Sequence, residues 1–313
     1  MITCSQRPTA IEQKTVCPWG CVGKVLPVSS SPAFEGWVHG VLECSSCGIW
    51  FSVPYSSSMS EDDHWDDLYH ANYSPYRKKL KHRHREARFA WLSKHRLAWL
   101  LPAPLRPSFP VAFGSKRSLE IGCGSGADLR RLVDLGWDAT GLEPHEEAAK
   151  RARQWSGATV LVKRFPTREL LPSSFDFILA QQVLEHLPSP VQAGREIAKL
   201  LRPGGVVQIS VPNCQSWAAQ KFGPHWAGWD VPRHRIHFTP HSLAQWGRAS
   251  GLVDVRVQTL IHAGWIRRSA RQCVGKGSTY LSKSRLGASL AARWGQWNGQ
   301  GDSLLLLARK PLR

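Results

Sequence analysis

The sequence of 313 residues has no long apolar runs and comparatively few acidic residues. No stretch reaches the roughly 18 uninterrupted apolar residues of a membrane-spanning helix, so we expect no membrane span. The first residues lack the apolar core of a signal peptide, and we therefore expect a cytoplasmic protein. With 42% hydrophobic residues, the composition is that of a globular protein and excludes disorder over the whole chain.

Basic residues outnumber acidic ones, with 41 Lys and Arg against 23 Asp and Glu and a formal net charge of +18. Residues 77–96 hold nine basic residues and one acidic residue, and residues 263–313 hold ten and one, so these two segments carry almost all of the excess. Such segments favour polyanions: nucleic acid, a phosphorylated substrate or an anionic surface. The simpler interpretation is a solvated basic helix face and a basic tail.

Four of the eight cysteines form two close pairs that are separated by 22 residues. In a reducing compartment this pattern favours a metal site over disulfides. Four thiolates suit one tetrahedral zinc ion and leave no open position for catalysis, so the sequence predicts a structural Zn²⁺. The alternative is a set of buried thiols without metal. The predicted ligands are Cys17, Cys21, Cys44 and Cys47, and we interpret Cys4, Cys123, Cys214 and Cys273 as isolated small apolar residues.

The order of predicted elements divides the chain into three parts: residues 1–54 with the cysteine pairs, a linker and basic helix at 55–112, and an α/β domain at 113–313. From residue 118 onward strands alternate with helices, which favours a parallel, doubly wound sheet. We expect strands near 118–122, 138–142, 158–162, 175–180, 205–211, 253–260 and 303–308. Helices are expected near 75–101, 126–136, 145–155 and 191–201.

A glycine-rich loop, LEIGCGSG at 119–126, links the first of these strands to a helix. Its glycines permit a tight turn and a close approach of the backbone to a ligand, and they also fit the pattern of nicotinamide-binding folds. Glu143, after the second strand, could accept hydrogen bonds from both ribose hydroxyls of a nucleoside cofactor, whether or not that cofactor contains nicotinamide. Glu120 argues against a dinucleotide cofactor, because its carboxylate would lie unfavourably close to the pyrophosphate. A cationic cofactor without phosphate would have no such conflict.

Together with GLEP at 141–144, FDFILAQQVLEHL at 175–187 and LLRPGG at 200–205, this loop resembles the class I S-adenosylmethionine-dependent methyltransferases. The resemblance covers about 118–260. It implies a Rossmann-like, seven-stranded sheet with its last strand antiparallel, and S-adenosylmethionine as cofactor. The cofactor-binding residues that follow from it are Glu120, Gly122, Cys123, Gly124 and Gly126 around the methionine part, Glu143 and Pro144 at the ribose, Phe165 at the adenine, and Gln181 and Gln182 facing the sulfonium and the acceptor.

One departure from the family concerns the adenine. Similar enzymes place an acidic residue after the third strand, but here residues 162–168 contain no carboxylate. Backbone groups and Phe165 would hold the adenine instead. The first 54 residues look like the small zinc ribbon that precedes many methyltransferases of this type.

Residues 212–250, rich in Trp and His, form an insertion after the fifth strand, where a loop would cover the acceptor site. A histidine there could take a proton from an acceptor hydroxyl. The catalytic candidates are His234 and His237 in the insertion and His186 after the fourth strand. Each could instead hold the covering loop together. Thr239 and Pro240 predict the start of a helix.

The sequence thus predicts methyl transfer by in-line displacement to a small molecule or biosynthetic intermediate. The basic segments would suit a phosphorylated or nucleotide-linked acceptor. An RNA methyltransferase that grips the backbone with the ribbon and the basic helix is the alternative, although motifs for base-amine or cysteine-based RNA methylation are missing. A non-catalytic binding module is a third interpretation, which only the missing adenine-side acid supports.

Overall fold

The computed structural model describes residues 17–21, 24–28, 41–52, 117–231, 233–273 and 278–312. The predicted linker and basic helix at 55–112 lie outside these residues. None of the helices in the described part is long and apolar enough to cross a membrane.

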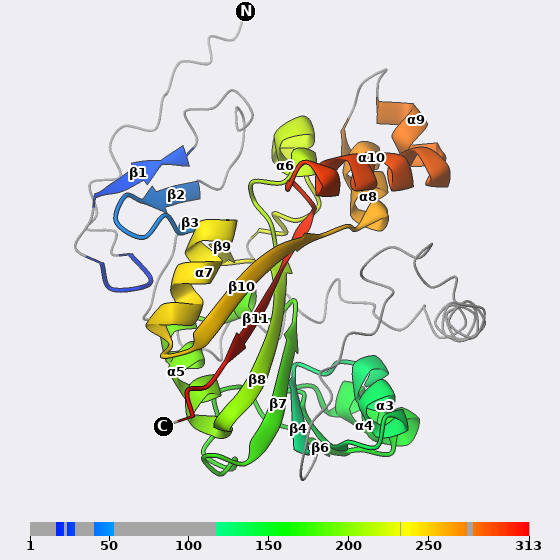
Figure 1. Cartoon of the computed structure of the whole chain (residues 1–313). Helices are drawn as coiled ribbons and strands as arrows, with labels where there is room; N and C mark the ends of the chain where they lie inside the picture. Colours follow the sequence, from blue (N-terminus) through cyan, green and yellow to red (C-terminus); the bar gives the residue numbers. More distant parts are fainter. Residues whose placement is uncertain are drawn as a thin grey trace, which may run out of the picture.

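A seven-stranded sheet forms the centre of the described chain (Figure 1). Its strand order is β10-β11-β8-β7-β4-β5-β6. The five strands from β8 to β6 are parallel, whereas β11 is antiparallel to both of its neighbours. The predicted fold class is therefore confirmed. The strands are β4 (Arg117–Ile121), β5 (Asp138–Leu142), β6 (Thr159–Leu161), β7 (Phe175–Gln181), β8 (Leu201–Pro212), β10 (Val253–Leu260) and β11 (Ser303–Arg309).

Helices cover both faces of this sheet, because the central strands are apolar on both sides. In β7, Phe177 and Leu179 pack with α3 (Ala127–Asp134) and α4 (Glu146–Ser156). The alternate residues Ile178 and Ala180 pack with α5 (Pro190–Leu200) and α7 (Pro240–Ala249). Thr239 caps α7 through a hydrogen bond from the Ser242 backbone N–H, as predicted.

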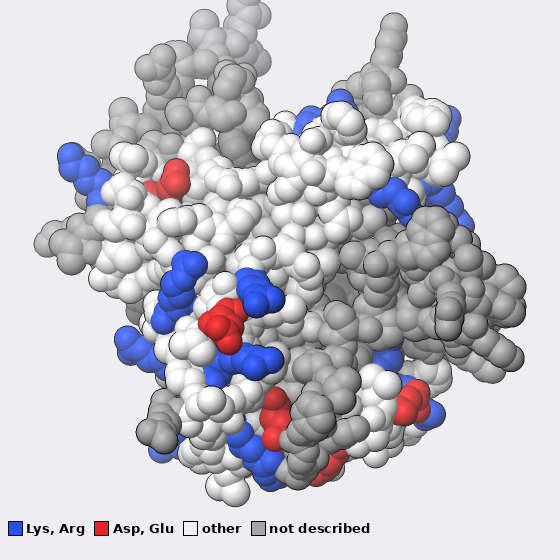
Figure 2. Space-filling view, viewed as in Figure 1, with Lys and Arg blue, Asp and Glu red and all other residues white. Residues whose placement is uncertain are grey.

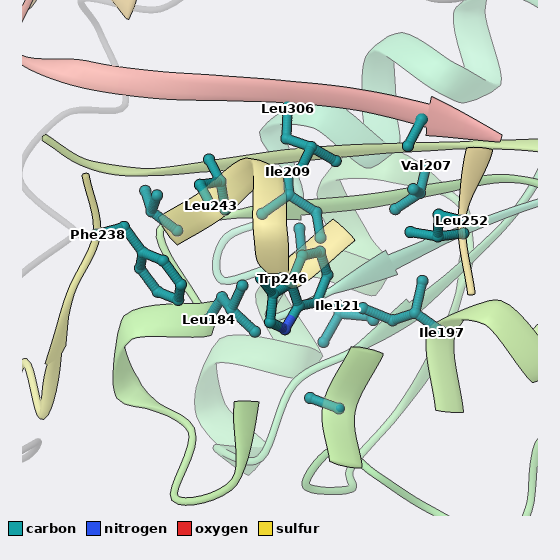
Figure 3. Packing of buried hydrophobic residues seen from close by; sticks show 14 of the residues in the cluster. Ile121, Leu184, Ile197, Val207, Ile209, Phe238, Leu243, Trp246, Leu252 and Leu306 are labelled. Carbon is teal, nitrogen blue, oxygen red and sulfur yellow. The ribbon is translucent and has the colours of Figure 1, made fainter. Parts of the chain in front are cut away.

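Trp246 of α7 lies at the centre of the apolar layer between the sheet and the helices α5 and α7 (Figure 3). Its ring is surrounded by apolar side chains from α5, α7 and the sheet, among them Leu243 and Ile209. The indole Nε1 donates a hydrogen bond of 2.7 Å to the carbonyl of Pro190. The one polar atom of this large side chain is thus satisfied inside the core.

The cysteine-bearing segment is joined to the α/β domain by a second, four-stranded sheet. Three of its strands come from the N-terminal part: β1 (Val25–Pro27), β2 (Val41–Cys44) and β3 (Trp50–Ser52). The fourth, β9 (Ile236–His237), comes from the insertion after β8 and pairs antiparallel with β3. Since Ile49 and Phe51 share an apolar cluster with Trp246, the segment packs on the α/β domain rather than standing apart.

Residues 263–312 do not form a basic tail, so that part of the simpler interpretation of the charge is wrong. Helices α8 (Ala263–Gln272), α9 (Ser278–Lys283) and α10 (Arg285–Trp297) lie between β10 and β11. Of these helices, α8 and α10 pack on α6 (Trp217–Phe222), and α8 also packs on the 3-10 helix η7 (Gly223–His225) of the insertion. β11 then inserts into the sheet between β10 and β8, where its apolar residues Leu304 and Leu306 are fully buried.

Asp302, directly before β11, is 2% exposed and accepts a hydrogen bond of 3.0 Å from the backbone N–H of His262. Burial raises the pKa of its carboxyl from 3.8 to about 7. The fold therefore favours the protonated form. The stability that Asp302 contributes is complete below the unfolded pKa and is lost as the pH rises through about 7.

We expect Asp302→Asn to raise the free energy of unfolding by about 2–4 kcal/mol at pH 8 and to leave it nearly unchanged at pH 4. Asparagine keeps an oxygen for the His262 N–H but carries no charge. Urea unfolding at both pH values measures the difference. Asp254→Asn, an exposed control, should change neither value. An equal response of Asp302→Asn at both pH values would contradict the assigned ionisation.

Candidate active site

The glycine loop after β4 requires glycine for two separate reasons. Gly122, Gly124 and Gly126 all have positive φ angles, of 68°, 53° and 78°. In addition, a Cβ at position 122 would lie 2.6 Å from a methyl group of Val183, and one at position 126 would lie 2.9 Å from the Cα of Ala152 in α4. The loop therefore turns sharply into α3 and leaves its backbone open to a ligand.

Glu143 follows β5 and points at this loop. Its carboxylate accepts hydrogen bonds from the backbone N–H of Gly124 at 2.9 Å and of His145 at 3.1 Å. The residue is 1% exposed, and burial raises the pKa of the carboxyl, although the two N–H groups lower it. A carboxylate held in this way offers its remaining lone pairs in a fixed direction.

Glu120, within β4, is a second buried carboxyl group close to the loop. Burial raises its pKa well above the usual value, and Asp128 raises it further. Its Oε2 is buried and has no hydrogen-bond partner among the described residues. Two carboxyl groups beside one glycine loop disfavour a phosphate and favour a cationic ligand.

The remaining residues that the sequence assigns to the cofactor are Cys123, Pro144 and Phe165. Cys123 is buried, and its N–H donates a hydrogen bond of 2.9 Å to the Leu142 carbonyl. Pro144 is exposed. Phe165, after β6, is 6% exposed and belongs to the same apolar cluster as Leu142.

Gln181 and Gln182 stand at the end of β7. Ser210 of β8 donates to the Gln181 side chain and accepts a hydrogen bond of 3.3 Å from Gln182 Nε2. Gln182 has a φ of 55°, and its Oε1 is buried without a partner among the described residues. Because β7, β4 and β5 are parallel neighbours, their carboxyl ends bring the two glutamines, the glycine loop and Glu143 to one edge of the sheet.

A cluster of Glu185, His186 and His234 follows β7, in which Glu185 and His234 are buried and His186 is half-buried. His186 Nδ1 lies 2.9 Å from the Arg233 carbonyl, and His234 Nδ1 lies 2.8 Å from the Gly228 carbonyl. The two imidazole rings are 4.7 Å apart. One possible ligand atom from each member lies within 4.8 Å of the others, and His234 Nε2 is 4.0 Å from Glu185 Oε1, so a water molecule or a cation could bridge them. Neither oxygen of Glu185 has a hydrogen-bond partner among the described residues.

Burial sets the charge state of this cluster. It raises the pKa of Glu185 to about 8 and lowers the pKa of His186 to about 3 and of His234 to about 4. Both histidines are therefore neutral near pH 7, while Glu185 exchanges its proton in the physiological range. Sequence reasoning assigned no role to Glu185, although the adjacent His186 in the QVLEH motif was a usable signal.

His237 is not a member of this cluster. It lies on β9, and its Nε2 forms a hydrogen bond of 2.7 Å with Ser52 Oγ of β3. Burial lowers its pKa to about 3. The Trp229 ring packs edge-on against the imidazole at 5.0 Å. Of the three catalytic candidates, the structure thus brings His186 and His234 together and turns His237 toward the cysteine-bearing segment.

The insertion also lines an open pocket of about 370 Å³. Asp230, on its wall, has a carboxylate oxygen 3.9 Å from His234 Nε2. Arg268 and Gln272 of α8 also line it. The pocket therefore lies between the insertion and α8.

The four predicted metal ligands converge. The Sγ atoms of Cys17, Cys21, Cys44 and Cys47 all lie within 4.8 Å of one another, and those of Cys17 and Cys47 are 3.6 Å apart. Tetrahedral zinc with bonds of about 2.3 Å separates its sulfur ligands by about 3.8 Å, so the thiols fit a zinc ion. The Trp19 N–H approaches Cys17 Sγ at 3.4 Å. Hydrogen bonding to Cys47 lowers the pKa of Cys17 to about 5.

Residues 82–257, more than half of the chain, match a protein family that is described as a methyltransferase domain. The chain belongs to this family. It is a class I S-adenosylmethionine-dependent methyltransferase, as its motifs predict and its sheet order confirms.

Several relatives of this methyltransferase are ubiquinone biosynthesis O-methyltransferases. That of Methylococcus capsulatus is 29% identical over 164 residues, 48% of this chain and 69% of the relative. That of Idiomarina loihiensis is 31% identical over 185 residues, 50% of this chain and 74% of the relative. Among solved structures, a chain from the complex between the Haloferax volcanii Trm112 methyltransferase activator and a methyltransferase has a TM-score of 0.51 at 19% identity, covering 80% of this chain and 100% of that one. This last likeness concerns the fold.

Proposed function

We propose that this methyltransferase methylates a hydroxyl group of a small molecule. The observation that carries the proposal is the buried Glu185, which has no hydrogen-bond partner among the described residues and lies beside two neutral histidines. An acceptor hydroxyl must lose a proton as its oxygen is methylated, and such a cluster can accept it. The relatives named as O-methyltransferases support this acceptor class over the RNA alternative.

The cofactor would lie along the carboxyl edge of β5, β4 and β7. We assign the ribose hydroxyls to Glu143 and the cationic methionine part to Glu120 and the glycine loop, including Cys123. Pro144 would border the ribose and Phe165 the adenine. Gln181 and Gln182 would face the sulfonium, where the unpartnered Gln182 Oε1 is available to a ligand.

S-adenosylmethionine supplies an electrophilic methyl group when it is bound, and the protein's part is alignment and proton transfer. An acceptor oxygen placed in line with the methyl–sulfur bond would take the methyl group, and the electron pair of that bond would stay on sulfur. Glu185, directly or through His186 or His234, takes the hydroxyl proton. A phenolic hydroxyl has a pKa of roughly 10. The pKa of Glu185, about 8, lies closer to that value than the pKa of an ordinary carboxyl group does, so Glu185 is the better proton acceptor for a phenol.

Glu143→Ala should weaken the binding of S-adenosylhomocysteine by about 1–3 kcal/mol, because both ribose hydroxyls and two backbone N–H groups lose their acceptor. Isothermal titration calorimetry measures the change. Glu147→Ala, an exposed position on α4, is the matched control and should bind normally. Unchanged affinity in Glu143→Ala would remove Glu143 from the cofactor site.

Glu185→Gln should lower kcat roughly 100-fold with little effect on S-adenosylhomocysteine affinity, because the base is lost while the shape is kept. We expect the wild-type rate to rise with pH up to about 8, the pKa of Glu185, and this limb to disappear in the variant. The assay follows methyl gain by mass spectrometry on a prenylated catechol, with ethanolamine phosphate and bulk RNA as competing acceptors. Glu196→Gln on α5 is the control.

Transfer to the amine or to RNA, but not to the catechol, would refute O-methylation of a small molecule. Transfer to the catechol with an unaltered pH profile in Glu185→Gln would remove Glu185 as the base and leave the acceptor class standing.

We further propose that the four cysteines bind a structural zinc ion that fixes the N-terminal segment against β9. The purified protein should contain about one zinc per chain. Cys44→Ser should lose the metal and more than about 2 kcal/mol of stability, because a small segment with little core of its own depends on its metal. Cys273→Ser, remote from the cluster in sequence, should keep both. A metal-free protein with unchanged thermal stability would contradict this role.

A further inference from the structure

Helix α10 is amphipathic in the reverse of the usual sense. Its buried residues are small: Gly287, Ala288, Ala292 and Gly295. Its large apolar residues face outward, with Leu286 69%, Leu290 58%, Trp294 59% and Trp297 83% exposed. A helix that serves only to cover a core buries its large residues and exposes polar ones. The outward face of α10 therefore has a purpose other than internal packing.

These four residues form a single continuous surface, which we call the apolar stripe. At 3.6 residues per turn they fall within an arc of about 80° on the helix. Tyr280 of α9 borders them: it is 66% exposed, and a Cβ at Gly287 would lie only 2.6 Å from its ring. The small residues beneath allow α10 to lie close to its neighbours and hold the stripe rigidly outward.

The surroundings of the apolar stripe are positively charged. Residues 263–301 contain seven Lys and Arg and no Asp or Glu. Three of these basic residues are exposed close to the stripe: Lys283 at the end of α9, and Arg285 and Arg293 on α10. On the face shown in Figure 2, the part of the surface over α8–α10 carries Lys and Arg and no acidic side chain among the described residues. Leu and Trp on one face with basic residues at its sides is the pattern of helices that lie in a membrane interface.

We propose that α10 docks this enzyme on an anionic lipid surface. The apolar stripe enters the boundary between headgroups and acyl chains, and the neighbouring Lys and Arg face the lipid phosphates. Tryptophan suits this depth because its ring is apolar while its N–H remains hydrated. Two other occupants of the apolar stripe fit less well. In a dimer formed through this face, two basic surfaces would oppose each other, and bound RNA would leave the leucines in contact with water.

The position of the stripe makes such docking relevant to the site. Leu260 at the end of β10 and Pro212 at the end of β8 both pair with Ser303, so α8–α10 emerge at the carboxyl edge of the parallel strands. The helices share an apolar cluster with Trp226 and Trp229 of the insertion. A membrane held against α10 would thus lie on the side of the molecule that carries the insertion.

Vesicle flotation tests the proposal directly, and independently of catalysis. The full-length protein should float with equimolar phosphatidylcholine–phosphatidylglycerol vesicles, far less with pure phosphatidylcholine, and less at high salt. The variant Trp294→Ser with Trp297→Ser should bind the anionic vesicles roughly tenfold more weakly. Leu171→Ser with Leu312→Ser, which alters residues 71% and 80% exposed outside α10, is the matched control and should float like wild type.

Retained S-adenosylhomocysteine binding and an unchanged circular dichroism spectrum establish that a variant is folded. A second pair, Lys283→Gln with Arg285→Gln, should weaken flotation while leaving the stripe intact. Failure of the wild type to float, or equal flotation of the tryptophan variant, would overturn the proposal. It would also fall if the tryptophan substitutions abolished a dimer seen by light scattering or the binding of RNA, without altering flotation.

Discussion

The parallel pairing of β4 with β5 and β7 is the constraint on which the site depends. Ile121 pairs with Leu142 on one side and with Ala180 on the other. The residues that follow these three strands therefore start from one level of the sheet. This brings the glycine loop, Glu143 and Gln181 together although they are far apart in the sequence. The positive φ angles at Gly122, Gly124 and Gly126 then turn the chain before any side chain can fill the space.

A second junction connects the cysteine cluster to the acceptor side. Ser52 of β3 bonds through its side chain to His237 and through its N–H to the Arg235 carbonyl, and the Arg235 N–H donates to the Glu185 carbonyl. Arg235, directly before β9, thus links β3 of the cysteine-bearing segment to the backbone of Glu185. Trp50 of β3 also stacks on Trp229 of the insertion, with ring centroids 6.4 Å apart. Ordering of the cysteines and ordering of the insertion are therefore coupled through direct contacts.

The sequence was sufficient for the sheet and for the edge that carries the residues we assign to the cofactor, because hydrophobic period and glycine spacing are local signals. It was insufficient for β9, a strand of two residues that exists only because β3 pairs with it. Nor did it reveal the burial of Glu185, which results from contacts with residues near 230. The helices α8–α10 were missed for a different reason: basic residues and outward-facing apolar residues of α10 obscure the usual pattern of a packed helix.

The same edge of the sheet thus combines buried carboxyl groups with a dense set of aromatic side chains. The burial of these carboxyl groups has an electrostatic consequence. Glu120 is 4% and Glu143 1% exposed, so little water would screen an interaction between either carboxylate and a cationic cofactor. A thioether product would carry no positive charge on sulfur and would lack that attraction. The two buried carboxyl groups would therefore favour binding of the cationic cofactor over retention of the product.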